Sequence, residues 1–174
     1  MPRDALLSFV DFARSEPAAM PLKDNLWRDT VSCLTLRDAL RVAPSTSIRE
    51  VVDSMQRNRA GCVMVCEGEK LSGVFTERDL LRRVLGERRT LDGPISTVMT
   101  ADPETATDDE PVGSVMLKMR EGGYRHLPVV DADGRITGRI SVREIVHYMV
   151  EHFPNDVYTL PPRPGQVQTT REGA

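Results

Sequence analysis

The sequence contains an internal repeat with a period of about 64 residues. Apolar residues recur at matched positions in the two copies: Ile48, Val51, Met55, Val63 and Val65 in the first, and Val112, Val115, Met119, Leu127 and Val129 in the second. One inserted residue then shifts the match, so that Gly73 corresponds to Gly138. Repeated units that are too small to bury their apolar faces alone stack on one another. We therefore expect two paired units with a ligand cleft between them.

The hydrophobic pattern predicts the same order of elements in each copy. In the first copy, Ser47 precedes an apolar stripe with helical spacing, and the run at 62–66 is typical of a buried strand. A turn at 67–70 leads to a return strand at 71–75 and a helix at 76–85. The second copy has a helix at 111–119, strands at 126–130 and 135–140, and a helix at 141–150. This order predicts an α+β fold, with two pseudo-symmetric β-α-β-β-α units packed sheet to sheet.

The repeat also predicts the domain organisation. We expect the first unit at residues 29–91 and the second at residues 92–153. Residues 1–28 form an N-terminal extension, with a short amphipathic helix predicted at 4–15. Residues 154–174 form a Pro-rich tail whose composition favours disorder.

Charge and composition exclude several classes of function. The net charge of −3 argues against a general affinity for nucleic acid or for membranes. We interpret the arginine-rich stretch at 78–89 as a solvated helix face. No apolar run is long enough for a signal peptide or for a bilayer span. Cys33, Cys62 and Cys66 form no CxxC pair, which fits a reducing compartment, so we expect a cytoplasmic protein.

The chain lacks the usual sequence signs of catalysis. Its three histidines do not have the spacing of metal ligands. No nucleophile–base pair and no paired carboxylates stand at a useful spacing. We therefore expect a protein that is not an enzyme and that needs neither a metal nor a cofactor.

Four short segments together resemble the CBS-domain pair, also called the Bateman module. They are Pro44-Ser-Thr-Ser-Ile48, Gly73-Val-Phe-Thr-Glu-Arg-Asp79, Arg125-His-Leu-Pro-Val-Val130 and Gly138-Arg-Ile-Ser-Val-Arg-Glu144. The resemblance covers about residues 31–153. It implies a stand-alone module that binds an adenosine-containing ligand such as AMP, ADP, ATP, NAD or S-adenosylmethionine between its units. It also implies a homodimer and a regulated partner protein.

The resemblance assigns the ribose and the adenine to particular residues. Thr76 and Asp79 would contact the ribose, whose two adjacent hydroxyl groups suit a carboxylate acceptor. Ile48 and Met64 would contact the adenine, and Pro128 stands where the second copy matches Met64. Thr-x-x-Asp is also a variant capping box, and a single apolar residue is more often part of a core. Both interpretations stay open for these residues.

The resemblance assigns the phosphates to basic residues. Arg125, His126 and Arg143 would face the cleft, and Arg78 matches Arg143 in the repeat. Arginine binds phosphate through its planar donor fork, so a phosphate-bearing ligand is favoured over cationic S-adenosylmethionine. Alternatively, Arg125 pairs with an acid such as Glu121, and His126 is an ordinary strand histidine.

The second copy of the signature departs from the first. Ser141 and Glu144 replace the threonine and the aspartate. Ser-x-x-Glu is the preferred capping box, and its longer acidic side chain moves the carboxylate away from a diol. We predict that this second site is weak, empty or differently selective. The sequence as a whole favours a regulatory module that binds AMP, ADP or ATP; the alternative is a dimerising interaction module without a ligand.

Overall fold

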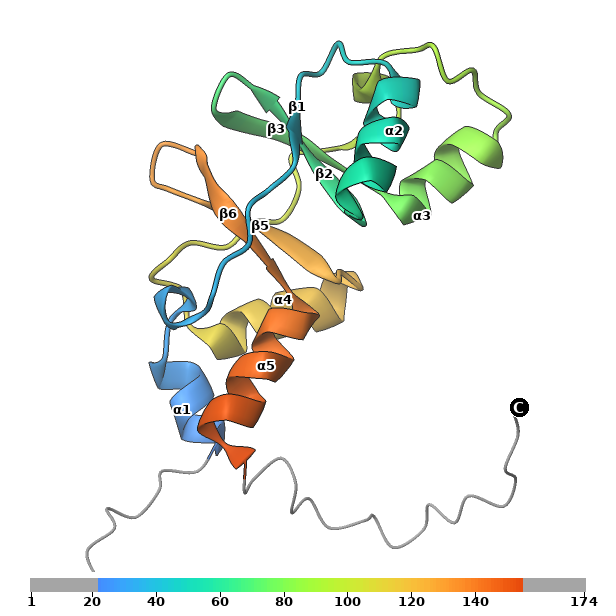
Figure 1. The fold of residues 1–174 in the computed structure, drawn as a ribbon. Helices are drawn as coiled ribbons and strands as arrows, with labels where there is room; N and C mark the ends of the chain where they lie inside the picture. The colour runs from blue at the N-terminus through green and yellow to red at the C-terminus, as the bar shows by residue number, and fades with distance from the viewer. Residues whose placement is uncertain (1–21, 155–174) are drawn as a thin grey trace, which may run out of the picture.

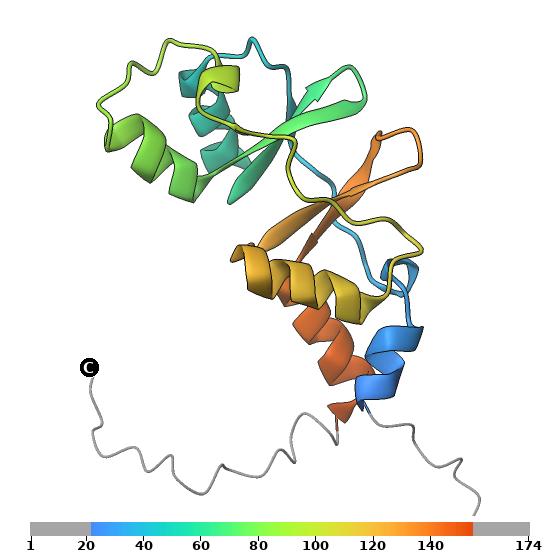
Figure 2. The same ribbon diagram turned by 180° about the vertical axis from the view of Figure 1, so that it is seen from behind.

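The computed structural model describes residues 22–154, which form two units stacked one on the other (Figure 1). The helix predicted at 4–15 and the C-terminal tail lie outside the described residues. In Figures 1 and 2 the two β-hairpins face each other at the middle of the molecule, and the helices cover the outer sides. None of the helices within residues 22–154 is long and apolar enough to cross a membrane.

The first unit is built on a four-stranded sheet. Its elements are β1 (Arg41–Val42), α2 (Ile48–Asn58), β2 (Cys62–Glu67), β3 (Lys70–Thr76), α3 (Glu77–Asp79), a π-helical segment η3 (Leu80–Leu85) and β4 (Thr100–Ala101). The strand order is β1-β2-β3-β4, with β1 parallel to β2 and the other pairs antiparallel. As predicted, α2 begins after Ser47, whose side chain accepts a hydrogen bond from the Glu50 amide in a full capping box.

The second unit repeats this arrangement with fewer regular strands. It contains α4 (Val112–Gly122), β5 (His126–Val130), β6 (Ile136–Ser141) and α5 (Val142–His152). A parallel bridge between Ala106 and Val129 takes the place of the β1–β2 pair. An antiparallel bridge between Arg37 and Arg139 takes the place of the β3–β4 pair. The predicted pair of similar α+β units is confirmed.

Each unit completes its core with a segment from the other side of the repeat. Val31 and Leu34, around the 3-10 turn η2 (Val31–Cys33), are buried in the core of the second unit. Ile95 and Val98, around the 3-10 turn η4 (Ile95–Thr97), are buried in the core of the first unit. The chain therefore crosses between the units twice. We call residues 31–37 and 95–101 the crossing segments, and neither core is complete without one of them.

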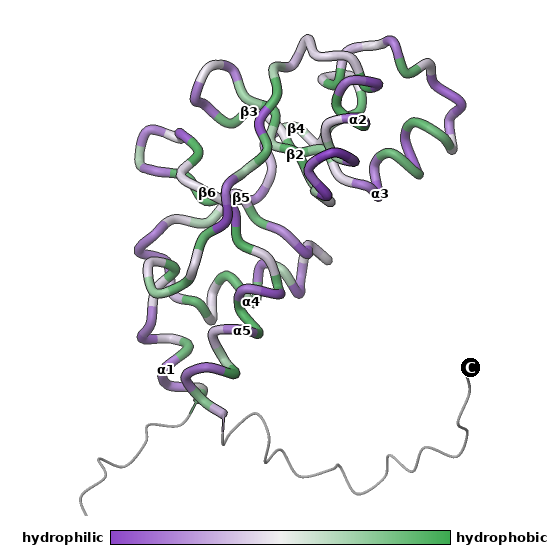
Figure 3. Tube along the Cα trace, in the orientation of Figure 1, coloured by the Kyte–Doolittle hydropathy of each residue, from purple (hydrophilic) through white to green (hydrophobic). Residues whose placement is uncertain are grey.

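A third apolar cluster joins the two sheets. Cys62, Met64 and Cys66 on β2 are buried against Ile136 on β6. Backbone hydrogen bonds also link the hairpins, from the Ile136 amide to the Glu69 carbonyl at 3.2 Å. In Figure 3 the hairpin turns are mainly hydrophilic, whereas the strands that lead to them are mainly hydrophobic. The predicted packing of sheet on sheet is confirmed.

The sequence did not predict the helix α1 (Leu22–Arg28), which packs against α4. Gly113 makes this approach possible, because a Cβ atom there would lie 3.0 Å from the Leu26 carbonyl oxygen and 3.1 Å from the Trp27 ring. The Tyr148 hydroxyl on α5 donates a hydrogen bond to the Asp29 carboxylate directly after α1. These contacts hold α1 against the helices of the second unit.

Candidate functional site

A pocket of about 590 Å³ opens between the two units. The first unit contributes the end of β3, the start of α3 and residues that follow β4. The second unit contributes the turn between α4 and β5 and the first residues of β5. Six residues predicted from the sequence line it: Thr76, Arg78, Asp79, Arg125, His126 and Pro128. The volume lies in the range of sites that hold small organic ligands.

Thr76 and Asp79 form the capping box at the start of α3. The Asp79 Oδ2 atom accepts hydrogen bonds from the Thr76 amide at 3.0 Å and from the Thr76 hydroxyl at 2.6 Å. The Asp79 amide in turn donates to Thr76 Oγ1 at 3.3 Å. The capping interpretation therefore holds, and the same contacts fix the carboxylate at the wall of the pocket.

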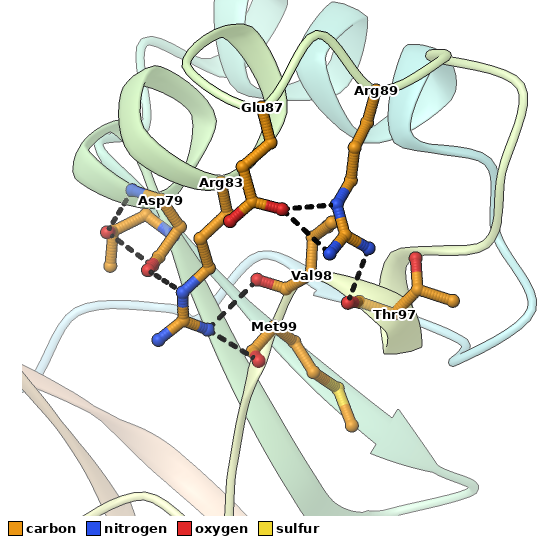
Figure 4. A network of polar contacts seen from close by, with 8 residues as sticks. Asp79, Arg83, Glu87, Arg89, Thr97, Val98 and Met99 are labelled. Carbon is orange, nitrogen blue, oxygen red and sulfur yellow. Dashed lines mark hydrogen bonds and ion pairs between the residues drawn. The ribbon is translucent and has the colours of Figure 1, made fainter.

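Arg83 is a second support for Asp79 that the sequence analysis missed (Figure 4). Its Nε atom lies 3.3 Å from Asp79 Oδ1, and its Nη1 atom donates to the carbonyl oxygens of Val98 and Met99 at 3.1 and 2.7 Å. Arg83 thus joins the start of α3 to the segment that contains Val98 and Met99. The signal in the sequence was the i, i+4 spacing of an acid and an arginine at a helix start.

The basic side of the pocket is made by both units. Arg82 and Arg125 are exposed, and within residues 22–154 no hydrogen bond or ion pair engages either guanidinium group. Arg78 reaches across the units and donates to the Gly123 carbonyl at 3.4 Å. The alternative pairing of Arg125 with Glu121 does not form; the Glu121 carboxylate lies 3.4 Å from Arg120 instead.

Acidic side chains at the pocket offset part of this positive charge. Glu77 and Glu104 also line the pocket. Glu104 lies 3.6 Å from Lys118, however, and Asp79 is paired with Arg83. Among residues 22–154, the charges of the pocket that have no ion pair are those of Arg78, Arg82, Arg125 and Glu77, so positive charge predominates.

His126 is half-buried in the wall of the pocket. Burial, and then the positive charge of Arg139, lowers the pKa of the His126 imidazole below its ordinary value. His126 is therefore neutral at pH 7, where it offers a hydrogen bond rather than a positive charge.

Apolar walls complete the pocket. Val74, Leu81, Pro103, Tyr124 and Pro128 all face it. Tyr124 is 42% exposed and was not predicted as a site residue. The turn Gly122-Gly123 positions its ring, since Gly123 has a left-handed φ of 65° and Gly122 has no side chain to displace the ring.

The other predicted site residues lie elsewhere. Ile48 is 1% exposed in the core of the first unit, and Met64 is 1% exposed in the cluster between the sheets. Ser141 is buried at the start of α5. Arg143 lines a separate pocket of about 130 Å³, together with Glu144 and others.

The carboxylate of the second signature makes the same kinds of contact as Asp79. Glu144 Oε2 accepts hydrogen bonds from the Ser141 amide and hydroxyl, and Glu144 Oε1 lies 3.5 Å from Arg37 Nε. Burial alone would raise the pKa of Glu144, but the hydrogen bonds from Ser141 outweigh it and the pKa is lowered. Within the described residues no group of three or more His, Cys, Asp or Glu side chains could hold a metal ion.

Comparison with known families gives the origin of this arrangement. The family model described as "CBS domain" matches residues 31–86 and again residues 95–151. The chain belongs to the CBS domain family. Its two matches are the two halves of the repeat, so this is a tandem CBS pair.

Three relatives illustrate the relationship. A CBS domain-containing protein of Arabidopsis thaliana, CBSCBSPB1, is 33% identical over 135 residues, which is 74% of this CBS pair but only 24% of the relative. A CBS domain protein from Pyrobaculum aerophilum, solved as a complex with AMP, has a TM-score of 0.65 and 28% identity over 74% of this chain and 98% of its own. The CBS domain pair of protein MJ0100, solved with 5′-methylthioadenosine and S-adenosyl-L-methionine, has a TM-score of 0.63 and 25% identity over 69% of this chain and 98% of its own.

Proposed function

We propose that this CBS pair is a regulatory module that binds an adenine nucleotide in the pocket between its units. One observation carries the proposal: Thr76 and Asp79 of the first unit share a pocket with Arg125 of the second unit. A sugar-binding acceptor and a phosphate-binding donor then stand on opposite sides of one hollow. A nucleotide is the common ligand that carries both complementary groups.

The ribose binds at the start of α3. A carboxylate has about four acceptor positions. Thr76 uses two on Asp79 Oδ2, and Arg83 uses one on Oδ1. One acceptor position remains for a ribose hydroxyl, and the capping box holds it in place without further ordering. Preorganisation of this kind reduces the entropy lost on binding.

The phosphate binds to the arginines whose guanidinium groups have no hydrogen-bond or ion-pair partner among the described residues. Arg82 and Arg125 lie at the same pocket, and Arg78 spans the two units beside them. Planar guanidinium groups match phosphate oxygens. We therefore favour AMP, ADP or ATP over S-adenosylmethionine, which is cationic at sulfur. AMP occupies the related protein of Pyrobaculum aerophilum.

The adenine lies between apolar walls of both units. Val74 and Pro103 stand on the first-unit side, and Tyr124 and Pro128 stand on the second-unit side. Aromatic and proline side chains present flat apolar surfaces to a purine. These residues replace Ile48 and Met64 in the proposal, because the latter are buried in cores outside the pocket.

Isothermal titration with AMP, ADP, ATP, NAD and S-adenosylmethionine tests this function. We expect the wild-type chain to bind a phosphate-bearing ligand, and Asp79→Asn and Arg125→Ala to weaken that binding about tenfold or more. Arg143→Ala is the matched control, since Arg143 corresponds to Arg78 but lines the other pocket. No heat from any of the five ligands at millimolar concentration would overturn the proposal.

The alternative function is a dimerising interaction module without a ligand. Two observations favour it: Thr76 and Arg83 already give the Asp79 carboxylate a structural role, and matched positions of the two units, Leu81 and Val146, expose apolar side chains. If Asp79→Asn lowers only the stability and no nucleotide binds, this alternative stands. We propose a homodimer in either arrangement, and light scattering of the purified chain tests it. Transmission of the bound state to a partner protein, and the absence of catalysis, belong to the same proposal.

A further inference from the structure

The repeat relates the nucleotide pocket to a second, pseudo-symmetric cleft between the units. The side chains at matching positions of the two clefts differ. In the first unit, Val74 and Met64 are cross-strand partners on the sheet face that meets the other unit. In the second unit the matching partners are Arg139 and Pro128. The nucleotide pocket takes one member from each pair, Val74 and Pro128. Its pseudo-symmetric counterpart would take the other two, Met64 and Arg139.

The backbone of Arg139 is fixed at the position that matches Val74 in the repeat. Its backbone exchanges two hydrogen bonds with Arg37, at 3.1 and 3.0 Å, which fixes the strand against the crossing segment. Its neighbour Ile140 is buried in the core of the second unit, so the alternation of β6 turns the Arg139 side chain to the opposite face, toward the first unit. The side chain is half-buried.

The surroundings of Arg139 show where its charge lies. The guanidinium group acts electrostatically on Cys62, His126 and Glu144. Cys62 corresponds to His126 in the repeat, and Glu144 is the acid of the second signature. Cys62 and Glu144 would border a nucleotide in the counterpart cleft, whereas His126 lines the first pocket. The charge of Arg139 therefore acts on groups of both units.

We propose that the Arg139 side chain occupies the second cleft, so that the chain binds one nucleotide, and that the smaller Val74 keeps the first cleft open. This inference rests on the nucleotide site proposed above. It gives a physical reason for a single site that is independent of the exchange of aspartate for Glu144. The small pocket near Arg143 is the signature end of this cleft, because Arg143, Glu144 and His147 match Arg78, Asp79 and Arg82 of the nucleotide pocket, and only about 130 Å³ of it stays open.

A pair of exchanged variants tests the inference by the stoichiometry of AMP binding. The wild-type chain is expected to bind one equivalent, Arg139→Val to bind a second, and Val74→Arg to lose the first. The double variant Asp79→Asn/Arg139→Val should keep one equivalent, which assigns the new site to the second cleft. Circular dichroism checks that each variant is folded. Two equivalents in the wild type, or one in folded Arg139→Val, would overturn the inference while leaving the nucleotide function in place.

Thiol labelling gives a readout that needs no nucleotide. In a Cys33→Ser background, Arg139→Ala should speed the reaction of Cys62 with a thiol reagent by about tenfold, because the buried thiol becomes accessible. Cys66 on the same strand is the internal control for general opening. The charge of Arg139 lowers the pKa of Cys62, although burial raises it overall, so removal of the charge alone would slow the reaction. An unchanged labelling rate of Cys62 would show that the Arg139 side chain does not occupy the second cleft. A wild-type chain that binds no AMP would contradict only the nucleotide function.

Discussion

At the scale of single residues, the same side chains serve the fold and the site. Asp79 caps α3 and faces the pocket, so the helix start that the sequence needs for stability is also the acceptor that a sugar needs. Glu144 makes matching contacts with Ser141 and Arg37, but it lines the smaller pocket of about 130 Å³. The difference between the two units is set by what stands around equivalent acids rather than by the acids themselves.

His126 predicts how stability depends on pH. Its pKa is lowered from an ordinary value of 6.5, so the unfolded chain binds the proton more readily than the folded one. The stability that His126 contributes is complete when the pH is above the ordinary pKa of histidine, and it is lost as the pH falls through that pKa. We expect the thermal midpoint to decrease between about pH 7 and pH 5.

The control for this prediction is His126→Gln, which removes the titrating group. Its midpoint should change less over the same interval. Glu144, whose pKa is lowered, contributes stability that is lost only at more acidic pH, below its ordinary value of 4.5. Identical pH profiles for the two proteins would contradict the prediction.

At the scale of elements, each hairpin is completed by a crossing segment that passes over a glycine. A Cβ atom on Gly73 would lie 2.4 Å from Met99 Sδ and 3.0 Å from the Thr100 carbonyl oxygen. At the matching Gly138 it would lie 3.1 Å from Leu36 Cβ and 3.4 Å from the Arg37 carbonyl oxygen. The crossing is therefore tighter in the first unit.

We expect Gly73→Ala to lower the free energy of unfolding by about 1–3 kcal/mol, because the crowding at β4 forces a shift of the strand. Gly138→Ala should cost less than about 1 kcal/mol, since its neighbours need to yield only slightly. Urea unfolding of the two variants measures both values. An equal cost, or a larger cost at Gly138, would show that the crossing segments are not held as described.

The sequence predicts elements better than it predicts contacts between them. The alternation and the caps locate the strands around Val63 and Val129 and the helix after Ser47, because these signals are local. Met64 was placed at the adenine because the repeat identifies its strand but not which of two related clefts it faces. Arg83 and Tyr124 were missed because their roles depend on where a crossing segment and a turn bring the opposite unit.

At the scale of the whole molecule, the units are intertwined rather than merely adjacent. Ile95 and Val98 complete the first core, and they lie after the end of the unit expected at residues 29–91. Val31 and Leu34 complete the second core from the other end of the chain. Folding of one unit therefore depends on segments that the repeat assigns to the other.

This arrangement predicts which fragments fold. A fragment of residues 22–91 lacks Ile95, Val98 and β4, so its core stays open and we expect little helical signal. A fragment of residues 38–102 contains the whole first core and should show clearly more helix by circular dichroism. Equal helix content in the two fragments, measured at the same concentration and temperature, would contradict the intertwined architecture.

The two crossings have a consequence for damage to the chain. Cleavage of the chain near Leu34 weakens the attachment of apolar residues that complete the core of the second unit. Cleavage near Val98 has the same effect on the core of the first unit. Cleavage near Leu34 should therefore destabilise the second unit, and cleavage near Val98 should destabilise the first unit. After such a cleavage, protease sensitivity and amide exchange should increase in the unit that does not contain the cleaved bond in its own repeat.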